Sequence, residues 1–240
     1  MKLSLVFIPC FSGAAWELRE FPMLAGWPNL VPTLPAASRL EDYVEWVRTL
    51  TRALPDFVLI GDSFGAAVAL AAASTPYLGR LRGLVASGGF AVNPLRQRAL
   101  AWLVRSGPHP RGASYRYGVL PMHGRLLASP YDCEGDRPWR IQDSIRLFQR
   151  HTPASAYWAR AHAAVTCDLR SQLPQIAVPT LLLTPEDDRL IAPAAIEPLL
   201  RIPHHWERCL PRTGHMFRFS HPTQYGEAIR QFLGEVLHDA

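Results

Sequence analysis

Apolar residues along the chain form two patterns: short unbroken runs, and longer stretches in which they recur every three or four positions. Unbroken runs are typical of strands that are covered on both faces, whereas the longer spacing is typical of helices. The two patterns alternate, which predicts a parallel sheet with helices on both faces. The expected strands are 2–8, 27–32, 57–60, 84–86, 178–184 and 204–210, and the expected helices are 38–54, 66–73, 191–200 and 222–237.

The alternation stops between residues 93 and 170. This segment holds twelve arginines against five acidic residues. Apolar residues at helical spacing predict helices at 95–104 and 141–148, the second started by residues 136–139, and no apolar run predicts a buried strand. We therefore expect an α/β core made of residues 1–92 and 171–240, with 93–170 inserted as a helical lid over the carboxyl edge of the sheet. The alternative is a plain helical subdomain whose arginines are simply solvated.

A glycine-flanked serine stands between one expected strand and the next helix, in the stretch Gly61-Asp62-Ser63-Phe64-Gly65. Strand, sharp turn and helix are the setting of a nucleophile elbow, in which the serine hydroxyl stands clear of the sheet. The glycines allow the strained turn and the close approach of helix to strand. The alternative is a glycine-rich turn around a buried serine. The flanking pattern favours the elbow.

A serine attacks a carbonyl only when a base accepts its proton and a third group orients that base. Active sites of open α/β sheets lie beyond the carboxyl ends of the strands. Asp188 and His215 follow expected strands, and the chain order serine, aspartate, histidine fits the elbow. Asp187 is the rival acid, but it lies closer to the strand and would more naturally hold the loop. His221 is the rival base, but it stands where the last helix begins.

Composition narrows the remaining possibilities. The 240 residues carry a formal charge of +5, almost wholly from arginine because Lys2 is the only lysine, and this is too mild to indicate a nucleic-acid partner. The four cysteines are far apart and lack metal-ligand or redox spacing, which favours free thiols in a reducing cytoplasm. The apolar run 64–73 is far too short to span a membrane. We expect a cytoplasmic protein whose chemistry needs no metal or cofactor.

With these motifs in place, the chain resembles the α/β-hydrolases along essentially its whole length, beginning at what corresponds to the family's third strand. The resemblance is carried by Gly61–Gly65, by the acid loop Glu186–Ile191 and by Gly214-His215. Within that family, residues 168–181, the size of the chain and the helical lid most resemble the esterases that cleave pimeloyl carrier-protein methyl ester.

The resemblance also implies an oxyanion hole made of two backbone N–H groups. One belongs to Phe64, directly after the nucleophile. The other belongs to Phe11, in the loop after the first strand. The family usually has His-Gly before that second donor, whereas this chain has Pro9-Cys10, and Thr184-Pro185 stands where a glycine commonly opens the acid loop. A backbone donor can come from any residue except proline, so the role of the loop is unaffected.

The sequence therefore predicts a serine carboxylesterase with Ser63 as nucleophile, His215 as base and Asp188 as orienting acid. A serine nucleophile argues against haloalkane dehalogenases and epoxide hydrolases of this fold, which use aspartate. The substrate would be a small ester or acyl compound. A thioesterase or methyl esterase acting on an acyl carrier protein is the alternative, because the arginine-rich segment suits an acidic partner. A ligand receptor that does not catalyse is the third possibility.

Overall fold

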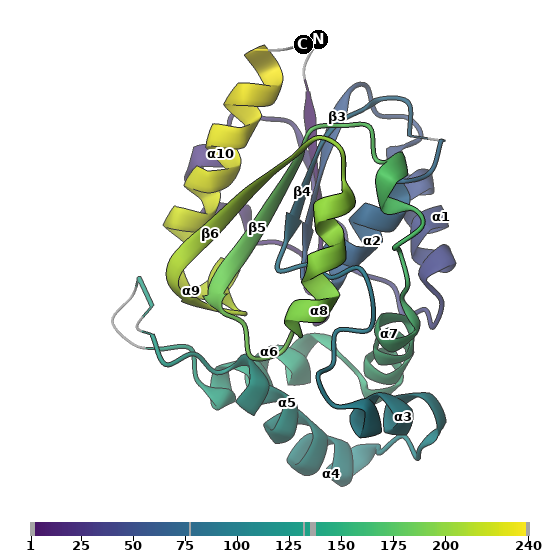
Figure 1. Ribbon diagram of the computed structural model, residues 1–240. Coiled ribbons are helices and arrows are strands. Elements are labelled where there is room, and N and C mark those ends of the chain that lie inside the picture. The colour runs from purple at the N-terminus through teal and green to yellow at the C-terminus, as the bar shows by residue number, and fades with distance from the viewer. Residues whose placement is uncertain (1–2, 77, 132, 135–137, 239–240) are drawn as a thin grey trace.

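The computed structural model describes residues 3–76, 78–131, 133–134 and 138–238. In this part of the chain, six parallel strands form one sheet in the order β2-β1-β3-β4-β5-β6 (Figure 1). This confirms the predicted parallel α/β architecture. The strands are β1 (Ser4–Ile8), β2 (Asn29–Leu30), β3 (Phe57–Asp62), β4 (Leu81–Ser87), β5 (Thr180–Asp187) and β6 (His205–Gly214).

The strand order reverses direction between β1 and β3. From β1 the chain moves outward to β2, then returns across β1 to form β3, and later strands continue outward on the other side. The loops that follow β1 and β3 therefore leave the sheet in opposite directions and open a crevice between them. Ligands of open α/β sheets bind at such a switch point. Both the elbow and the loop that contains Phe11 begin at this crevice.

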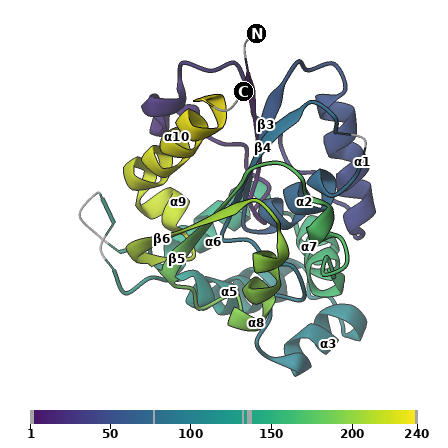
Figure 2. The ribbon, with the colours of Figure 1, turned by 45° about the horizontal axis from the view of Figure 1, so that its top comes forward.

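Helices cover both faces of the sheet (Figure 2). Because side chains of a strand alternate between its faces, Leu5 and Phe7 of β1 pack into one core and Val6 and Ile8 into the other. Both faces are apolar, so the central strands are fully buried. The face of Val6 is covered by α1 (Leu40–Thr51), α2 (Phe64–Ala73) and α8 (Pro193–Ile196), and the face of Leu5 by η1 (Leu18–Glu20), η2 (Pro22–Leu24) and α10 (Pro222–His238).

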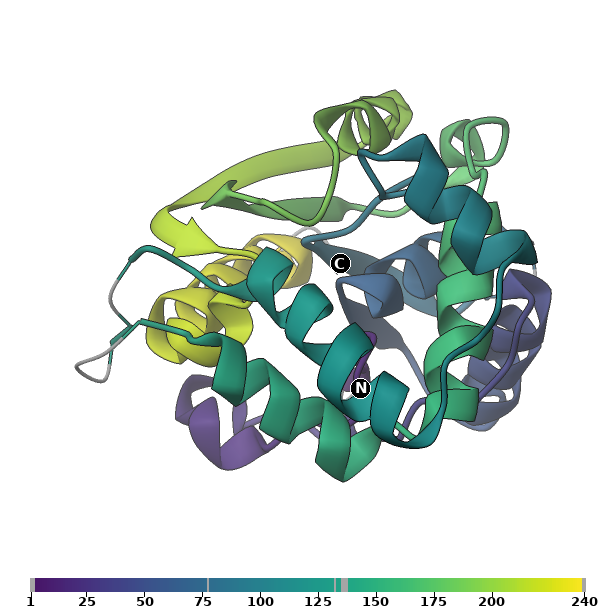
Figure 3. The same cartoon turned by 90° about the horizontal axis from the view of Figure 1, so that it is seen from below.

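The described residues of the segment 93–170 form a helical layer across the carboxyl end of the sheet (Figure 3). The two ends of this segment meet, because Val92 and Asp168 form an antiparallel bridge and Leu169 N donates to Ala91 O at 2.7 Å. The layer has an apolar core of its own. Its elements are α3 (Arg98–Ser106), α4 (Gly112–Ser114), η3 (Tyr115–Val119), α5 (Leu120–Leu127), α6 (Ile141–His151) and α7 (Ala154–Thr166).

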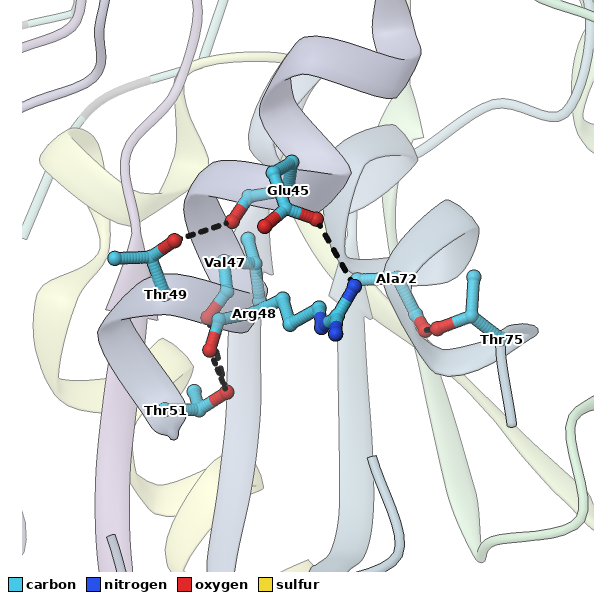
Figure 4. Close-up of polar contacts among 7 residues, drawn as sticks. All are labelled: Glu45, Val47, Arg48, Thr49, Thr51, Ala72 and Thr75. Atoms are coloured by element: carbon cyan, nitrogen blue, oxygen red, sulfur yellow. Dashed lines mark hydrogen bonds and ion pairs between the residues drawn. The ribbon is translucent and has the colours of Figure 1, made fainter. Parts of the chain in front are cut away.

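Local hydrogen bonds stabilise the C-terminal ends of α1 and α2 (Figure 4). These ends lie away from the helical layer, because each helix runs back from the carboxyl end of the sheet. Thr51 Oγ1 donates to Val47 O at 2.9 Å, and Thr75 Oγ1 donates to Ala72 O at 2.7 Å. A threonine hydroxyl near a helix end finds an acceptor one turn back in this way. The nearby ion pair of Arg48 with Glu45 is exposed, so it adds little to stability.

Several predicted boundaries differ from the structure. The helix expected at 38–54 begins at Leu40 and ends at Thr51, so Ser38 lies outside α1, whose N-cap is Arg39 in extended conformation. Helix α8 ends at Ile196 and continues as a 3₁₀ turn, η5 (Glu197–Arg201), because Pro198 lacks the N–H that an α-helix would need there. The start expected for α6 at 136–139 lies partly outside the described residues, and its N-cap is Arg140.

The last two strands are longer than predicted. Pro185 to Asp187 and Pro211 to Gly214 were expected to form loops, but they extend β5 and β6, with a register shift between Pro185 and Asp187. The pairing places Asp187 opposite Gly214. The residues that follow these two positions, Asp188 and His215, therefore leave adjacent strands at the same level.

Candidate active site

Ser63 lies in a strained turn between β3 and α2, at the crevice. Ser63 has φ 55° and ψ −117°, a conformation that costs a non-glycine residue free energy and is seen where function requires it. The turn leaves no room for side chains beside it: a Cβ on Gly61 would lie 2.4 Å from Gly65 O, and one on Gly65 would lie 2.3 Å from Pro9 O. The two glycines of the motif are therefore required by close backbone approach.

The three side chains predicted from the sequence lie in one hydrogen-bonded chain. Ser63 Oγ is 2.9 Å from His215 Nε2, and His215 Nδ1 is 2.7 Å from Asp188 Oδ2. A carboxylate only accepts, so Nδ1 carries the imidazole proton and Nε2 is left to accept the proton of the serine. All three side chains are almost fully buried.

Asp188 is held in place by its own loop. Its Oδ1 accepts hydrogen bonds from Leu190 N at 2.9 Å and Ile191 N at 2.8 Å, while Oδ2 faces His215. Asp187 instead accepts from Arg189 Nε at 2.9 Å at a partly exposed position. The geometry thus brings Asp188, and not Asp187, to His215.

Electrostatics favours the charged form of both partners in this pair. Burial alone lowers the pKa of His215, but the Asp188 carboxylate and its hydrogen bond outweigh burial, so the pKa is raised. Burial likewise raises the pKa of Asp188, and the His215 charge and hydrogen bonds reverse this to a net lowering. The arrangement therefore stabilises an imidazolium next to a carboxylate, the state that forms when the serine gives up its proton.

His221, the rival base, is also buried, but its Nδ1 lies 2.8 Å from Ser220 Oγ. Ser220 is the last residue of α9 (Phe217–Ser220), and His221 O accepts from Tyr225 N in the first turn of α10. His221 therefore belongs to the junction between these two helices.

The two predicted oxyanion donors flank Ser63. Phe64 N begins α2, where the first N–H groups of a helix have no partner within it. Phe11 lies in the loop after β1, and its ring meets that of Phe64 edge-to-face at 6.2 Å. Among the described residues no protein acceptor is found for either N–H group. Both are thus available to a ligand, and Phe11, Ser63 and Phe64 line the same cavity.

A cavity of about 330 Å³ opens beside Ser63, between the sheet and the helical layer. Its walls are almost entirely apolar, and helices α3, α5 and α7 supply half of the residues that line it. Apolar residues of the helical layer on this wall include Leu100, Leu103, Val104, Met122, Trp158 and Ala161. A cavity of this size and composition suits a hydrocarbon group rather than a charged one.

One polar side chain on the cavity wall was not expected from the sequence. His123 was not singled out from the sequence, yet it lines the cavity and its ring meets that of Phe11 edge-to-face, with ring centroids 5.5 Å apart. Its Nδ1 lies 3.0 Å from Tyr157 Oη. Burial, with a smaller contribution from His215, lowers the pKa of His123 to about 3, so the ring is neutral. The periodicity of apolar residues reports only which face of a helix is buried, so it could not indicate that a single histidine on α5 lines the cavity.

A buried ion pair next to the nucleophile was also missed. Arg218 Nε donates to Asp62 Oδ2 at 2.7 Å, and both side chains are almost fully buried. The guanidinium lies over the rings of Trp16 and Phe219, at 4.4 and 3.9 Å from their centroids. The pair joins the residue before Ser63 to helix α9, which begins two residues after His215.

The comparisons with known proteins agree with this fold. The model of the "Alpha/beta hydrolase family" matches residues 5–228, which is nearly the whole chain. The chain belongs to this family. No curated protein is similar in sequence. Among the residues that the structure describes, no His, Cys, Asp and Glu side chains gather as they would around a metal, and no helix is long and apolar enough to cross a membrane.

Solved structures share the fold of this alpha/beta hydrolase at low sequence identity. An esterase from Thermogutta terrifontis superposes with a TM-score of 0.74 at 22% identity, covering 98% of this chain and 91% of the other. An esterase from Exiguobacterium antarcticum gives 0.73 at 16%, covering 98% and 91%. A bromoperoxidase from Bacillus anthracis gives 0.73 at 14%, covering 98% and 92%. At such identities the likeness establishes the fold alone, and it does not single out the carrier-protein methyl esterases.

Proposed function

We propose that this alpha/beta hydrolase is a serine carboxylesterase that cleaves esters of apolar carboxylic acids. One observation carries the proposal: the chain of hydrogen bonds from Asp188 through His215 to Ser63 ends at an apolar cavity. The segment 93–170 acts in this proposal as a lid, because its helices form most of the cavity wall. Two of the structural neighbours are named as esterases, which is in keeping with it.

Acylation begins when Ser63 Oγ attacks the ester carbonyl and its proton passes to His215 Nε2. The 2.9 Å contact places the base within reach of that proton. The Asp188 carboxylate stabilises the imidazolium, and the N–H groups of Phe11 and Phe64 donate to the developing oxyanion. His215 then gives the proton to the leaving alcohol, and an acyl group remains on Ser63.

Deacylation repeats these steps with water as the nucleophile. His215 accepts a proton from water, the hydroxide attacks the acyl carbonyl, and the same donors hold the second oxyanion. Collapse of this intermediate returns the proton to Ser63 and releases the acid. The residues named here suffice for each proton transfer.

We expect the cavity to select acyl chains by length. Each methylene that leaves water for an apolar wall contributes about 0.8 kcal/mol, so kcat/KM should rise by several-fold per methylene until the cavity is filled and then fall. The measurement is kcat/KM for p-nitrophenyl esters from acetate to palmitate. Leu103→Trp, which shortens the cavity at α3, should move the optimum toward shorter chains, whereas Trp206→Ala, on an exposed position of β6, should not. An absence of turnover across the whole panel would contradict the proposal.

The pH profile should follow the titration of His215. Catalysis needs the neutral imidazole, and the pKa of His215 is raised above its usual 6.5, so kcat/KM should be low in acid and reach half its plateau at a pH above 6.5. The stability linkage has the opposite sign: the interaction with Asp188 stabilises the fold while His215 is charged, and it is lost as pH rises through the raised pKa. Rates with a neutral ester from pH 5 to 9 test this, and a midpoint well below 6.5 would argue against His215 as the base.

A carrier protein as acyl donor is the second candidate, favoured by the exposed arginines of α3, η3 and α5, among them Arg98, Arg116 and Arg125. Carrier proteins are acidic, so attraction should speed association and should weaken as salt screens it. We expect kcat/KM to fall steeply with ionic strength for an acyl carrier-protein substrate and to stay nearly constant for a neutral aryl ester. Equal, shallow dependence for both would leave the arginines as solvated surface.

A further inference from the structure

The loop that contains Phe11 is held by a buried arginine from the helical layer. Arg160, on α7, is only 3% exposed. Its Nη1 donates to Phe11 O at 3.1 Å and to Ser12 O at 2.9 Å. The other two nitrogens donate to the loop after β2: Nη2 to Leu34 O at 2.6 Å and Nε to Pro35 O at 3.2 Å. One guanidinium thus joins two loops of the core to the layer above them.

These contacts act on the peptide groups that determine where the Phe11 N–H points. Cys10 O accepts from Gly13 N at 2.8 Å, which closes a tight turn. In a trans peptide the N–H points opposite to the carbonyl, so the Phe11 N–H points out of the turn. The next two carbonyls, of Phe11 and Ser12, are bound by Arg160. The carbonyls of Cys10, Phe11 and Ser12 are thus all hydrogen-bonded, so none of them can rotate toward the oxyanion site while these bonds are kept.

The turn is built around the guanidinium. Gly13 has φ +77°, and a Cβ at this position would lie 2.4 Å from Arg160 Nη1. Thr152, which precedes α7 and is 1% exposed, donates from Oγ1 to Ser12 O at 2.7 Å as a second bond from the layer. Glycine here therefore serves both the backbone conformation and the close approach of the charge.

Arg160 has no carboxylate to balance it. Among the described residues, no Asp or Glu forms an ion pair with it; it donates to four backbone carbonyls and also interacts with the neutral hydroxyl of Tyr43. A buried charge is expensive, and apolar side chains of similar size often replace buried charged groups without loss of stability. The geometry of the loop, rather than stability, is what the charge provides.

We propose that Arg160 is a positioning residue that holds the turn 10–13 so that the Phe11 N–H faces the oxyanion. The inference rests on the proposed function, because it concerns the same site. It implies that catalysis depends on the contact between α7 and the core even though Arg160 lies behind the turn and does not touch substrate. It also explains why Pro9-Cys10 can stand where the family usually has His-Gly before the donor: the loop is held by hydrogen bonds from Arg160, which lies outside it.

The test compares the affinities of Arg160→Met and of wild type for two inhibitors, one that forms an oxyanion in the site and one that does not. A trifluoromethyl ketone adds Ser63 Oγ to its carbonyl carbon, the serine proton moves to His215, and the carbonyl oxygen becomes an oxyanion. The matching secondary alcohol binds the cavity but forms no adduct. Because loss of one oxyanion donor costs about 10² to 10³ in kcat, we expect Arg160→Met to lose about 10² in kcat and in affinity for the ketone. KM and affinity for the alcohol should change little.

Two further variants complete the design. His162→Ala is the matched control, because His162 lies on the same helix and its Nδ1 is 3.1 Å from Ser38 O of the core, yet it does not touch the turn. It should leave both affinities unchanged. Thr152→Val removes one neutral hydrogen bond to Ser12 O and should lower kcat by up to about tenfold. This variant tests the proposal if Arg160→Met does not fold.

Active sites are counted by fluorophosphonate titration, so that misfolded protein does not contribute to kcat. Unchanged affinity for the ketone in both Arg160→Met and Thr152→Val, with turnover by wild type intact, would overturn the inference and leave the proposed function standing. Equal losses for ketone and alcohol would also overturn it, because they would mean a damaged cavity. Absence of turnover and of labelling at Ser63 in wild type would instead refute the proposed function.

Discussion

Replacing Ser63 by alanine is expected to lower kcat for an aryl ester by about 10⁵- to 10⁶-fold, because nucleophile and base act as a unit. The side chain is small and its neighbours are held by backbone contacts, so the fold should survive. Without the hydroxyl, His215 Nε2 loses its hydrogen-bond partner at 2.9 Å. Labelling by a fluorophosphonate probe should disappear at the same time as turnover.

A second serine provides the control for this experiment. Ser74 is also buried and ends the same helix, α2, where its Oγ donates to Ala71 O at 2.8 Å. Ser74→Ala should keep both labelling and turnover. If Ser63→Ala continued to be labelled at another serine with wild-type stoichiometry, the nucleophile would lie elsewhere and the elbow would be a structural turn.

Asp188→Asn is expected to lower kcat by about 10⁴ while keeping the fold. The carboxylate accepts from Leu190 N and Ile191 N through Oδ1 and from His215 through Oδ2. An asparagine that keeps the two backbone bonds must turn its NH₂ group toward His215 Nδ1. That nitrogen would then accept, Nε2 would carry the proton, and the imidazole could no longer take the proton of Ser63.

Asp187→Asn is the matched control. It differs by one position and changes only an exposed contact with Arg189, so its kcat should stay within a few-fold of wild type. Because the Asp188 carboxylate is what raises the pKa of His215, the midpoint of the pH profile should also fall in Asp188→Asn. A larger loss in Asp187→Asn than in Asp188→Asn would show that the wrong carboxylate has been assigned.

The parts of the fold that could be predicted are those whose pattern is local. Unbroken apolar runs predicted the strands of the sheet because both faces are buried, and Gly61–Gly65 predicted the turn because close backbone approach requires glycine there. The positions of Asp188 and His215 also followed from local order, since each comes directly after a strand. The structure brings these two residues to Ser63 as predicted. Their catalytic roles stay predictions.

What could not be predicted depends on contacts between distant residues. The pair of Asp62 with Arg218 joins positions 156 residues apart, and Arg160 binds carbonyls more than 120 residues away. An isolated arginine in an arginine-rich segment looks solvated, and most arginines of 93–170 are indeed exposed. Backbone carbonyls as acceptors leave no trace in the sequence, so neither the buried arginine nor the neutral His123 could be singled out.

The position of β6 at the edge of the sheet affects when the site forms. The elbow is complete within the first 90 residues, where β1, β3 and β4 pair with one another, whereas His215 follows the last strand and is placed only when β6 pairs with β5. Strands β5 and β6 are neighbours in the chain, but β5 pairs with β4 across the whole 93–170 segment, and pairing between distant segments is the slow part of folding. On the proposed function, a partly folded chain in which β5 and β6 have not yet joined the sheet would hold Ser63 without its base. Recovery of activity during refolding should then report the docking of these two strands, and Ser63 should stay unreactive until both are in place.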